Sequence, residues 1–279
     1  MEKFLLWALR NYMKWGLMGD NVNVAIIDQP LALNHSEYKG KVASYKVFAP
    51  KKIKMPVSSM HGPAVASLLV GENLGTAPKA KLYYYATPSW LRDSMYPAQA
   101  LEDIVKINKK LNEKEKIKFV SVSAAFSGKG SPFLKNFDLW DKAVEKAKES
   151  GICVVDCSSN NGFIKPGFIN YADQMFKYGF PDNPENMPYG KIHVPNGLRT
   201  VAQSYDNMHF SYSYWGKGGL SWGIPYATGI LCLGQQINPN LSAEELKQLL
   251  IKSSDDNHII NPQGYINLVK DTLDKSRSL

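Results

Sequence analysis

Short apolar runs alternate with amphipathic stretches along most of this 279-residue chain. Apolar runs of about four to eight residues are typical of buried strands, and longer stretches with apolar positions three and four apart indicate helices. The alternation therefore predicts a parallel sheet covered by helices, in one domain over residues 1–279. The predicted strands are Asn23–Asp28, Lys81–Ala86, Lys118–Ala124, Ile152–Cys157 and Arg199–Ser204. The predicted helices are His61–Val70, Ala98–Leu111, Phe133–Ser150, Trp222–Gln236 and Ser242–Lys252.

The chain from Phe163 to Val194 lacks this alternation. It is rich in proline, glycine, asparagine and tyrosine. Such a composition predicts a long, functional loop region.

Composition and charge narrow the class of protein. The formal net charge is +8, with lysines scattered and loosely grouped in 39–54 and 106–118. This favours a solvated lysine surface over nucleic-acid binding. Three cysteines cannot form a disulfide framework, which favours free thiols and a reducing compartment. The apolar run before Arg10 is too short for a signal peptide or a membrane span, so we expect a cytoplasmic protein without membrane attachment.

Polar residues follow several of the predicted strands. Asp28 ends the first strand, residues 123–126 end another, and residues 157–160 follow a third. Ligand sites of open α/β sheets form at the carboxyl ends of the strands. We therefore expect the functional site at this edge of the sheet.

Four residues have the types needed for nucleophilic hydrolysis. A serine hydroxyl needs a base, the base needs a carboxylate to orient it, and the oxyanion needs donors. Ser221 begins a predicted helix of small residues in GLSWGIPYATG, and His61 begins another in HGPAVASLLVG. Asp28 closes the strand VAIID, and Asn160 lies in SSNNG after a later strand. Taken singly, each fits a structural role as well: a helix start for His61, a turn for Asp28 or Asn160.

Their order resembles that of the subtilisin-like serine proteases. VAIID is similar to the family's aspartate strand, HGPAVASLLVG to its HGTxVAG segment, GICVVDCSSNNG to its GVVVVAAAGNEG segment, and GLSWGIPYATG to its GTSMASPHVAG segment. GTAPKAKLYYYA and the final GYINLVKDTL also resemble family segments. The Asp, His, Ser order is that of subtilisin. The resemblance implies a three-layer α/β/α fold with a mostly parallel, doubly wound sheet.

The resemblance also implies roles in a serine endopeptidase. Ser221 would attack the peptide carbonyl, His61 would carry the proton, and Asp28 would hold the histidine tautomer. Asn160 would donate its amide to the oxyanion, beside the backbone N–H of Ser221. The partner would be a peptide or protein substrate, and the oligomeric state stays open.

Substrate contacts follow from the same resemblance. The segment Ser123, Ala124, Ala125 and Phe126, together with the loop near Thr87–Ser94, would clamp the substrate as an added strand. Ala125, Cys157 and Ser159 would line the primary specificity pocket. Ala125 and Ser159 replace glycines of the family pattern, so we expect a narrow pocket that disfavours large aromatic residues.

Several neighbours of these residues depart from the family pattern. Gln29-Pro30 follow the aspartate, Pro63 follows His61-Gly62, and Leu220 and Trp222 flank the serine. Pro225 falls in or just after the first turn, where we expect little loss of helical hydrogen bonding.

No cofactor is expected from the sequence. LLVGENLGTAPKA is shorter than the calcium loop of secreted subtilisins, and the chain has no HExxH or paired CxxC zinc pattern. PDNPENMPYG at 181–190 has oxygen ligands for calcium but lacks EF-hand spacing.

Two other functions are weighed against the protease. A catalytically silent subtilase scaffold would bind peptide or protein partners without cleaving them. A nucleotide-binding α/β protein would need a glycine-rich loop after the first strand, which residues 28–31 do not provide.

Overall fold

Five parallel strands form the central sheet of the computed structural model, which describes residues 16–169, 178–179, 192–216, 218–254 and 258–277. The strand order is β2-β3-β1-β4-β5, and every pairing is parallel. The strands are β1 (Asn23–Asp28), β2 (Val42–Val47), β3 (Lys81–Ala86), β4 (Phe119–Val122) and β5 (Cys153–Asp156).

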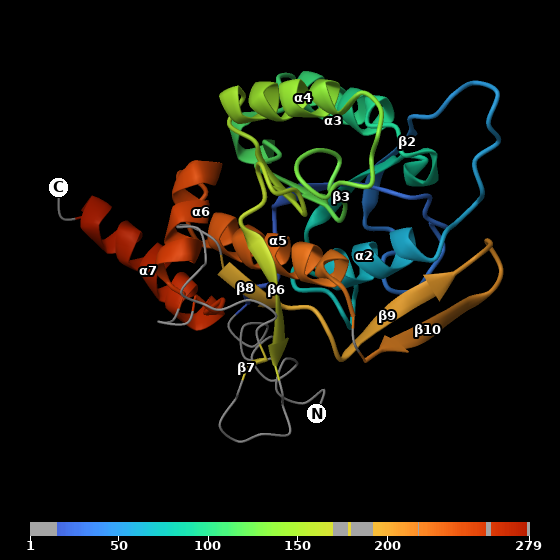
Figure 1. The fold of residues 1–279 in the computed structure, drawn as a ribbon. Coiled ribbons are helices and arrows are strands. Elements are labelled where there is room, and N and C mark those ends of the chain that lie inside the picture. Colours follow the sequence, from blue (N-terminus) through green and yellow to red (C-terminus); the bar gives the residue numbers. More distant parts are fainter. Residues whose placement is uncertain (1–15, 170–177, 180–191, 217, 255–257, 278–279) are drawn as a thin grey trace.

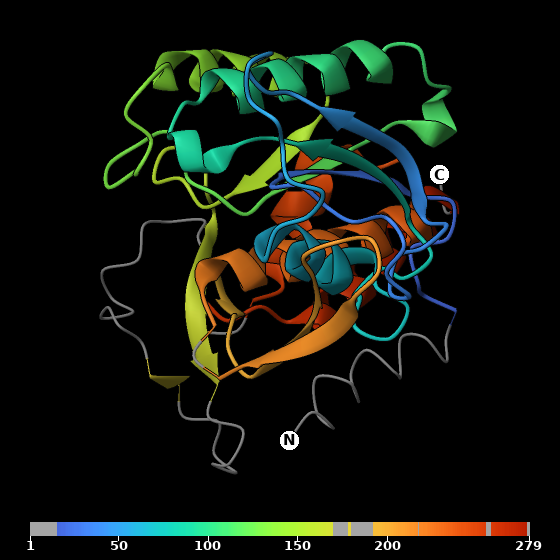
Figure 2. The ribbon, with the colours of Figure 1, turned by 90° about the vertical axis from the view of Figure 1, so that its right-hand side faces the viewer.

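Helices cover both faces of this sheet (Figures 1 and 2). Side chains of β1 alternate between two cores: Ala25 and Ile27 pack with one, Val24 and Ile26 with the other. This is the period of two expected for a strand buried on both faces. The first core holds α3 (Met95–Asn108) and α4 (Phe137–Glu149); the second holds α2 (His61–Val70), α5 (Leu220–Ile237), α6 (Ala243–Lys252) and α7 (Pro262–Arg277).

This layering confirms the predicted three-layer α/β/α fold. From β1 the chain passes to β2 at one edge, returns to β3 beside β1, and then continues to β4 and β5 on the other side of β1. The order therefore reverses at β1. In open α/β sheets a crevice forms at this point, at the carboxyl ends of the strands. Asp28 ends β1, and Ser123 directly follows β4.

Two parts of the sequence prediction are wrong. The region from Phe163 to Val194 is not wholly irregular, because β6 (Ile164–Ile169) pairs in parallel with β8 (Ile192–Pro195) and antiparallel with the short β7 (Tyr178–Gly179). Proline and glycine within these short strands hide their pattern. The predicted strand Arg199–Ser204 is β9, but it leaves the central sheet and forms an antiparallel hairpin with β10 (Phe210–Trp215). The exposed aromatic residues of β10 gave no burial pattern to read.

The other predicted elements are present, and most of their ends lie within three residues of the predicted positions. The bounds of β1, β3 and α2 are as predicted, while α4 starts four residues later than predicted. A loop with Gly128 and Gly130 at positive φ precedes it. In the described part of the chain, no helix is both long and apolar enough to cross a membrane. The calcium candidate at 181–190 lies outside the described residues.

Candidate active site

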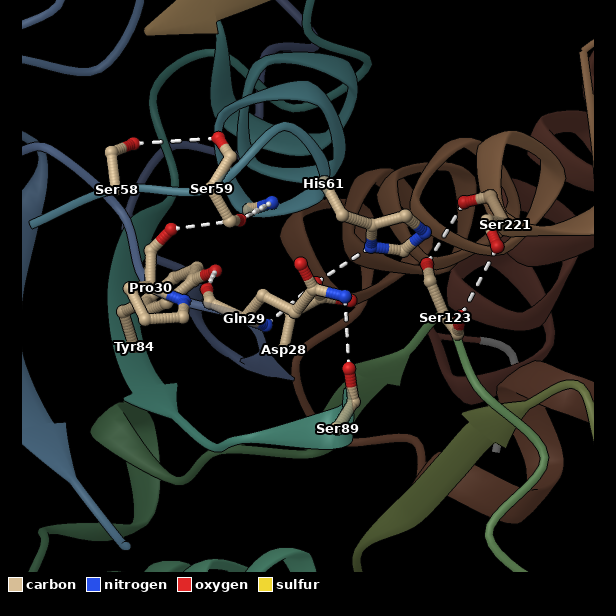
Figure 3. Close-up of polar contacts among 11 residues, drawn as sticks. Asp28, Gln29, Pro30, Ser58, Ser59, His61, Tyr84, Ser89, Ser123 and Ser221 are labelled. Carbon is tan, nitrogen blue, oxygen red and sulfur yellow. Dashed lines mark hydrogen bonds and ion pairs between the residues drawn. The ribbon is translucent and has the colours of Figure 1, made fainter. Parts of the chain in front are cut away.

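The carboxyl end of β1 meets the first turn of α2 at a buried ion pair. Asp28 ends the strand with 4 % of its side chain exposed, and His61 starts the helix with 18 % exposed. Nδ1 of His61 lies 2.7 Å from Oδ1 of Asp28. An ionised carboxylate only accepts hydrogen bonds, so Nδ1 donates and the neutral ring keeps its free lone pair on Nε2. Figure 3 shows the ring between Asp28 and Ser221.

Hydrogen bonds made by Gln29 and Tyr84 support the position of the Asp28 carboxylate. The amide of Gln29 donates to Oδ1 of Asp28 at 2.7 Å, and the hydroxyl of Tyr84 donates to the carbonyl of Gln29. Gly62 lets the first turn of α2 approach this segment, because a Cβ there would lie 2.5 Å from the carbonyl oxygens of Gln29 and Pro30. The sequence Gly62 after His61 therefore reflects close packing of helix and strand end.

The Asp28 charge also changes the acidity of His61. Burial alone would lower the pKa of the imidazole, because it disfavours the charged form. The charge of Asp28 and its hydrogen bond act in the opposite direction and outweigh burial, so the pKa of His61 lies above its ordinary value. A base whose charged form is stabilised in this way is suited to receive a proton.

Ser221 lies in the first turn of α5 and is bonded reciprocally to Ser123. The hydroxyl of Ser221 donates to the carbonyl of Ser123 at 3.2 Å, and the hydroxyl of Ser123 donates to the carbonyl of Ser221 at 2.8 Å (Figure 3). In a regular helix the amide of residue 225 would bond to the carbonyl of residue 221. Pro225 has no amide hydrogen, so one helical bond is lost and Ser123 supplies the donor in its place.

Trp222 covers one side of the histidine. It is buried, and its ring lies 5.3 Å from that of His61 between centroids, tilted by 31°. The ring of Trp215, at the end of β10, also lies near Trp222, with 6.0 Å between the ring centroids. The bulky residue beside Ser221 therefore joins the hairpin to the candidate site.

A cleft of about 280 Å³ opens beside His61. The segment after β4 forms one wall, and the segment after β3, which includes the short helix η1 (Ser89–Leu91), forms the other. Of the residues expected to bind substrate, Ser123, Ala124 and Ala125 line this cleft, whereas Cys157 and Ser159 do not. The lining residues are Asp28, Gln29, His61, Ser89, Trp90, Arg92, Ser123, Ala124, Ala125, Phe126, Pro132 and Phe133.

Asn160 lies in the exposed turn after β5. Its Oδ1 faces Gly128, where an added Cβ would lie 3.1 Å away, and Gly128 has φ +89°. Asn160 does not line the His61 cleft; it borders a separate depression with Lys148 and Glu244. The structure thus brings Asp28, His61 and Ser221 together and leaves the Asn160 side chain turned toward the neighbouring loop.

The turn that carries Asn160 is anchored by a buried carboxylate. Oδ1 of Asp156 accepts from the amide of Ser158 at 3.1 Å and from its hydroxyl at 2.9 Å. The Ser158 hydroxyl in turn accepts from the amide of Asn161 at 3.0 Å. Burial raises the pKa of Asp156 to about 6, although its hydrogen bonds from Ser158 act to lower it.

Several contacts at this site were not anticipated from the sequence. Nε2 of Gln29 donates to the hydroxyl of Ser89 at 2.9 Å, which ties η1 to the end of β1. Arg92 and Trp90 face the cleft from the same segment. For Ser123, the signal was present: a proline four residues after Ser221 leaves a carbonyl that needs another donor.

The described residues hold no group of three or more His, Cys, Asp or Glu side chains that could bind a metal ion. The three cysteines are free thiols; burial raises the pKa of Cys153 to about 12 and that of Cys157 and Cys232 further. Thiols with such raised pKa values are poor nucleophiles at neutral pH.

The model of the subtilase family matches residues 19–196, more than half of the chain. The chain belongs to the subtilase family.

Solved structures show how far the subtilase fold extends. The protease domain of PatA matches with a TM-score of 0.67 at 18% identity, over 92% of this chain and 98% of that one. The PatG macrocyclase domain matches with a TM-score of 0.66 at 15% identity, over 94% of each chain. The prenylagaramide maturation protease PagA matches with a TM-score of 0.63 at 16% identity, over 95% and 98%. At these identities the likeness establishes a shared fold.

Proposed function

We propose that this subtilase is a serine endopeptidase that hydrolyses peptide bonds through Asp28, His61 and Ser221. The observation that carries the proposal is the 2.7 Å bond between His61 Nδ1 and the buried Asp28, with Ser221 on the far side of the ring. The peptide would lie in the cleft beside His61, where the segment from Ser123 to Phe126 offers backbone for strand addition.

Acylation begins when the Ser221 hydroxyl turns from the carbonyl of Ser123 to Nε2 of His61. His61 takes the proton as Oγ forms a bond to the substrate carbonyl carbon, and the carbonyl electrons move to oxygen. The imidazolium is stabilised by Asp28. His61 then gives the proton to the leaving amine as the C–N bond breaks, and a water repeats the sequence on the acyl-enzyme.

The oxyanion would be stabilised from two sides. Ser221 lies in the first turn of α5, whose amides lack intrahelical acceptors and whose dipole favours negative charge. Asn160 would add its side-chain amide after turning from Gly128 toward the cleft. The reciprocal bonds between Ser123 and Ser221 would hold the serine in register with the end of β4.

Substrate selection would begin at the residue before the scissile bond. We assign its pocket to Ala125, Cys157 and Ser159, with Ser123 and Ala124 contacting the backbone. The side chains at positions 125 and 159 narrow the pocket, so reporter peptides ending in Ala or Leu should be cleaved faster than an otherwise identical peptide ending in Phe. A clear preference for Phe would contradict this assignment.

A second candidate function is a silent subtilase scaffold that binds peptides. Two observations favour it: the Ser221 hydroxyl is bonded to a carbonyl and not to His61, and Trp222 covers one side of the imidazole. Against it stands the complete set of Asp28, His61 and Ser221. In free enzymes, catalytic hydrogen bonds often tighten only when substrate binds.

A fluorophosphonate probe separates the two functions. Labelling of the wild type and not of Ser221→Ala would support the protease, and an unlabelled but folded wild type would support the scaffold. Digestion of a peptide pool by the same pair then reports cleavage sites.

The products also show which reaction takes place. One structural neighbour is a macrocyclase solved with a peptide. Mass spectrometry of the pool distinguishes hydrolysis, which adds water, from transfer of the acyl group to an amine.

The proposal treats the whole chain as one peptidase domain. Its support is the match to PatA, PatG and PagA over more than nine tenths of the chain. Free thiols at Cys153, Cys157 and Cys232 fit a reducing compartment such as the cytoplasm.

A further inference from the structure

One wall of the cleft carries a cation that the proposed chemistry does not use. Arg92 lines the cleft together with His61, and the other described lining residues include no lysine or second arginine. Trp90, which is 45 % exposed, and the rings of Phe126 and Phe133 line the same cleft. One arginine and several aromatic residues therefore line the same cleft as His61.

The backbone of Arg92 is held in place from both sides. Its amide donates to the carbonyl of Ser89 at 3.0 Å, and its carbonyl accepts from the amide of Leu134 at 3.1 Å. Ser89 is itself bonded to Gln29, next to Asp28. Arg92 is thus tied to the end of β1 and to the loop before α4, and its position relative to the cleft is fixed.

The side chain has no carboxylate partner within the described part of the chain. Asp28 is bonded to His61, and the neighbouring Asp93 accepts from Asn136 and from the amide of Met95. Arg92 also has φ +51°, a left-handed conformation that glycine adopts more readily. An exposed arginine that occupies such a position without an ion pair is available to a ligand.

We propose that Arg92 makes the cleft selective for peptides that carry a carboxylate side chain two to four residues before the scissile bond. This rests on the proposed function, because it places the acyl side of the peptide along Ser123 to Phe126. A guanidinium binds a carboxylate through two parallel hydrogen bonds, and the apolar walls at Trp90 and Phe133 suit the methylene groups of glutamate.

Matched peptides test this selectivity. Three series of reporters would carry Glu, Gln or Lys at one of the three upstream positions and be identical elsewhere. At one position we expect kcat/KM for Glu to exceed that for Gln by about tenfold, and Lys to be the poorest. Raising the salt to about 0.5 M should shrink the difference. Equal rates for Glu and Gln at all three positions would overturn the proposal.

Two variants assign the effect to Arg92. Arg92→Gly fits the left-handed backbone and should abolish the Glu over Gln preference, and Arg92→Glu should favour Lys. Lys252→Glu on α6 makes the same change in net charge away from the cleft and should keep the wild-type preference. Thermal unfolding checks that each variant folds. A Glu preference that survives in Arg92→Glu would refute the role of this residue.

Binding separates this proposal from the protease function. Fluorescence anisotropy with folded Ser221→Ala measures Kd for uncleaved Glu and Gln peptides. We expect Ser221→Ala to bind the Glu peptide more tightly than the Gln peptide, and the double variant Ser221→Ala/Arg92→Glu to lose this preference. That result would support acid recognition even if the fluorophosphonate probe fails to label the wild type. Labelling of Ser221 with equal Kd values would sustain the protease and reject the role of Arg92.

Discussion

Two buried aspartates end parallel strands of the same sheet, yet their surroundings give them different chemistry. Asp28 ends β1 and is bonded to His61 at the start of α2. Asp156 ends β5, is completely buried, and is bonded to Ser158 in its own following turn. The first carboxylate faces a base beside a cleft, whereas the second organises a loop.

The difference shows that a strand-terminal carboxylate acquires its function from its partner. Asp28 stabilises a positive charge on His61 and raises the pKa of that ring. Asp156 is bonded to Ser158 and forms no ion pair within the described residues, and burial raises its own pKa to about 6. One carboxylate is therefore suited to electrostatic support of catalysis, and the other to holding the turn of Asn160.

The largest expected effect is that of Asp28→Asn. An amide in place of the carboxylate favours the wrong histidine tautomer, so we expect kcat to fall by about 10⁴-fold. The wild-type kcat/KM should fall as the pH drops through the raised pKa of His61, because the base must be neutral. In Asp28→Asn this acid limb should move to lower pH.

The same substitution at Asp156 is the matched control for activity. Asp156→Asn changes a carboxylate to an amide at the end of β5, away from His61, and should lower kcat by less than about tenfold. Equal losses in the two variants would break the distinction between them.

Asn160→Ala tests whether the Asp156 loop contributes to catalysis. Loss of one oxyanion donor lowers kcat by about 10²–10³-fold, a figure that comes from subtilisin itself. Asn161→Ala, one residue along the same turn, serves as the control. A change below threefold for Asn160→Ala would leave oxyanion stabilisation to the start of α5.

Asp156→Asn should change the pH dependence of stability. A carboxyl whose folded pKa is raised contributes stability that is present below its unfolded pKa and lost as the pH rises through about 6. The variant lacks this loss, so its free energy of unfolding relative to wild type should improve between pH 4 and 8, by at most about 3 kcal/mol. Urea unfolding at pH 4 and pH 8 measures the free energy of unfolding of both proteins. An equal difference between variant and wild type at the two pH values would contradict a buried, titrating Asp156.

Ser123→Ala has the smallest expected effect. It removes the donor to the Ser221 carbonyl, which Pro225 leaves without a helical partner, and should lower the free energy of unfolding by about 1 kcal/mol and kcat by up to about tenfold. Ser121→Ala on β4, the strand directly before Ser123, is the control, because the buried hydroxyl of Ser121 has no hydrogen-bond partner among the described residues. Equal kcat values for both variants would exclude a positioning role for Ser123.

Much of the fold could be predicted because buried strands and helices have recognisable apolar patterns within one short segment. The short apolar runs in NVAIID and KLYYYA predicted the bounds of β1 and β3, and the small apolar residues after His61 predicted those of α2. Which strand pairs with which other strand cannot be predicted from such a local pattern. The strand Arg199–Ser204 was recognised, but its antiparallel partner β10 was not, since its exposed aromatic residues lack a buried face.

The sequence by itself determined the family, the three-layer fold and the residue types needed for the chemistry, because each of these lies in a short contiguous motif. Only the tertiary structure decided which groups meet. The bonds between Ser123 and Ser221, and between Gln29 and Ser89, join residues 98 and 60 positions apart. Arg92 reaches the cleft because η1 is tied to β1. Such contacts depend on how strands and helices cross in space, which a periodic pattern along one segment does not encode.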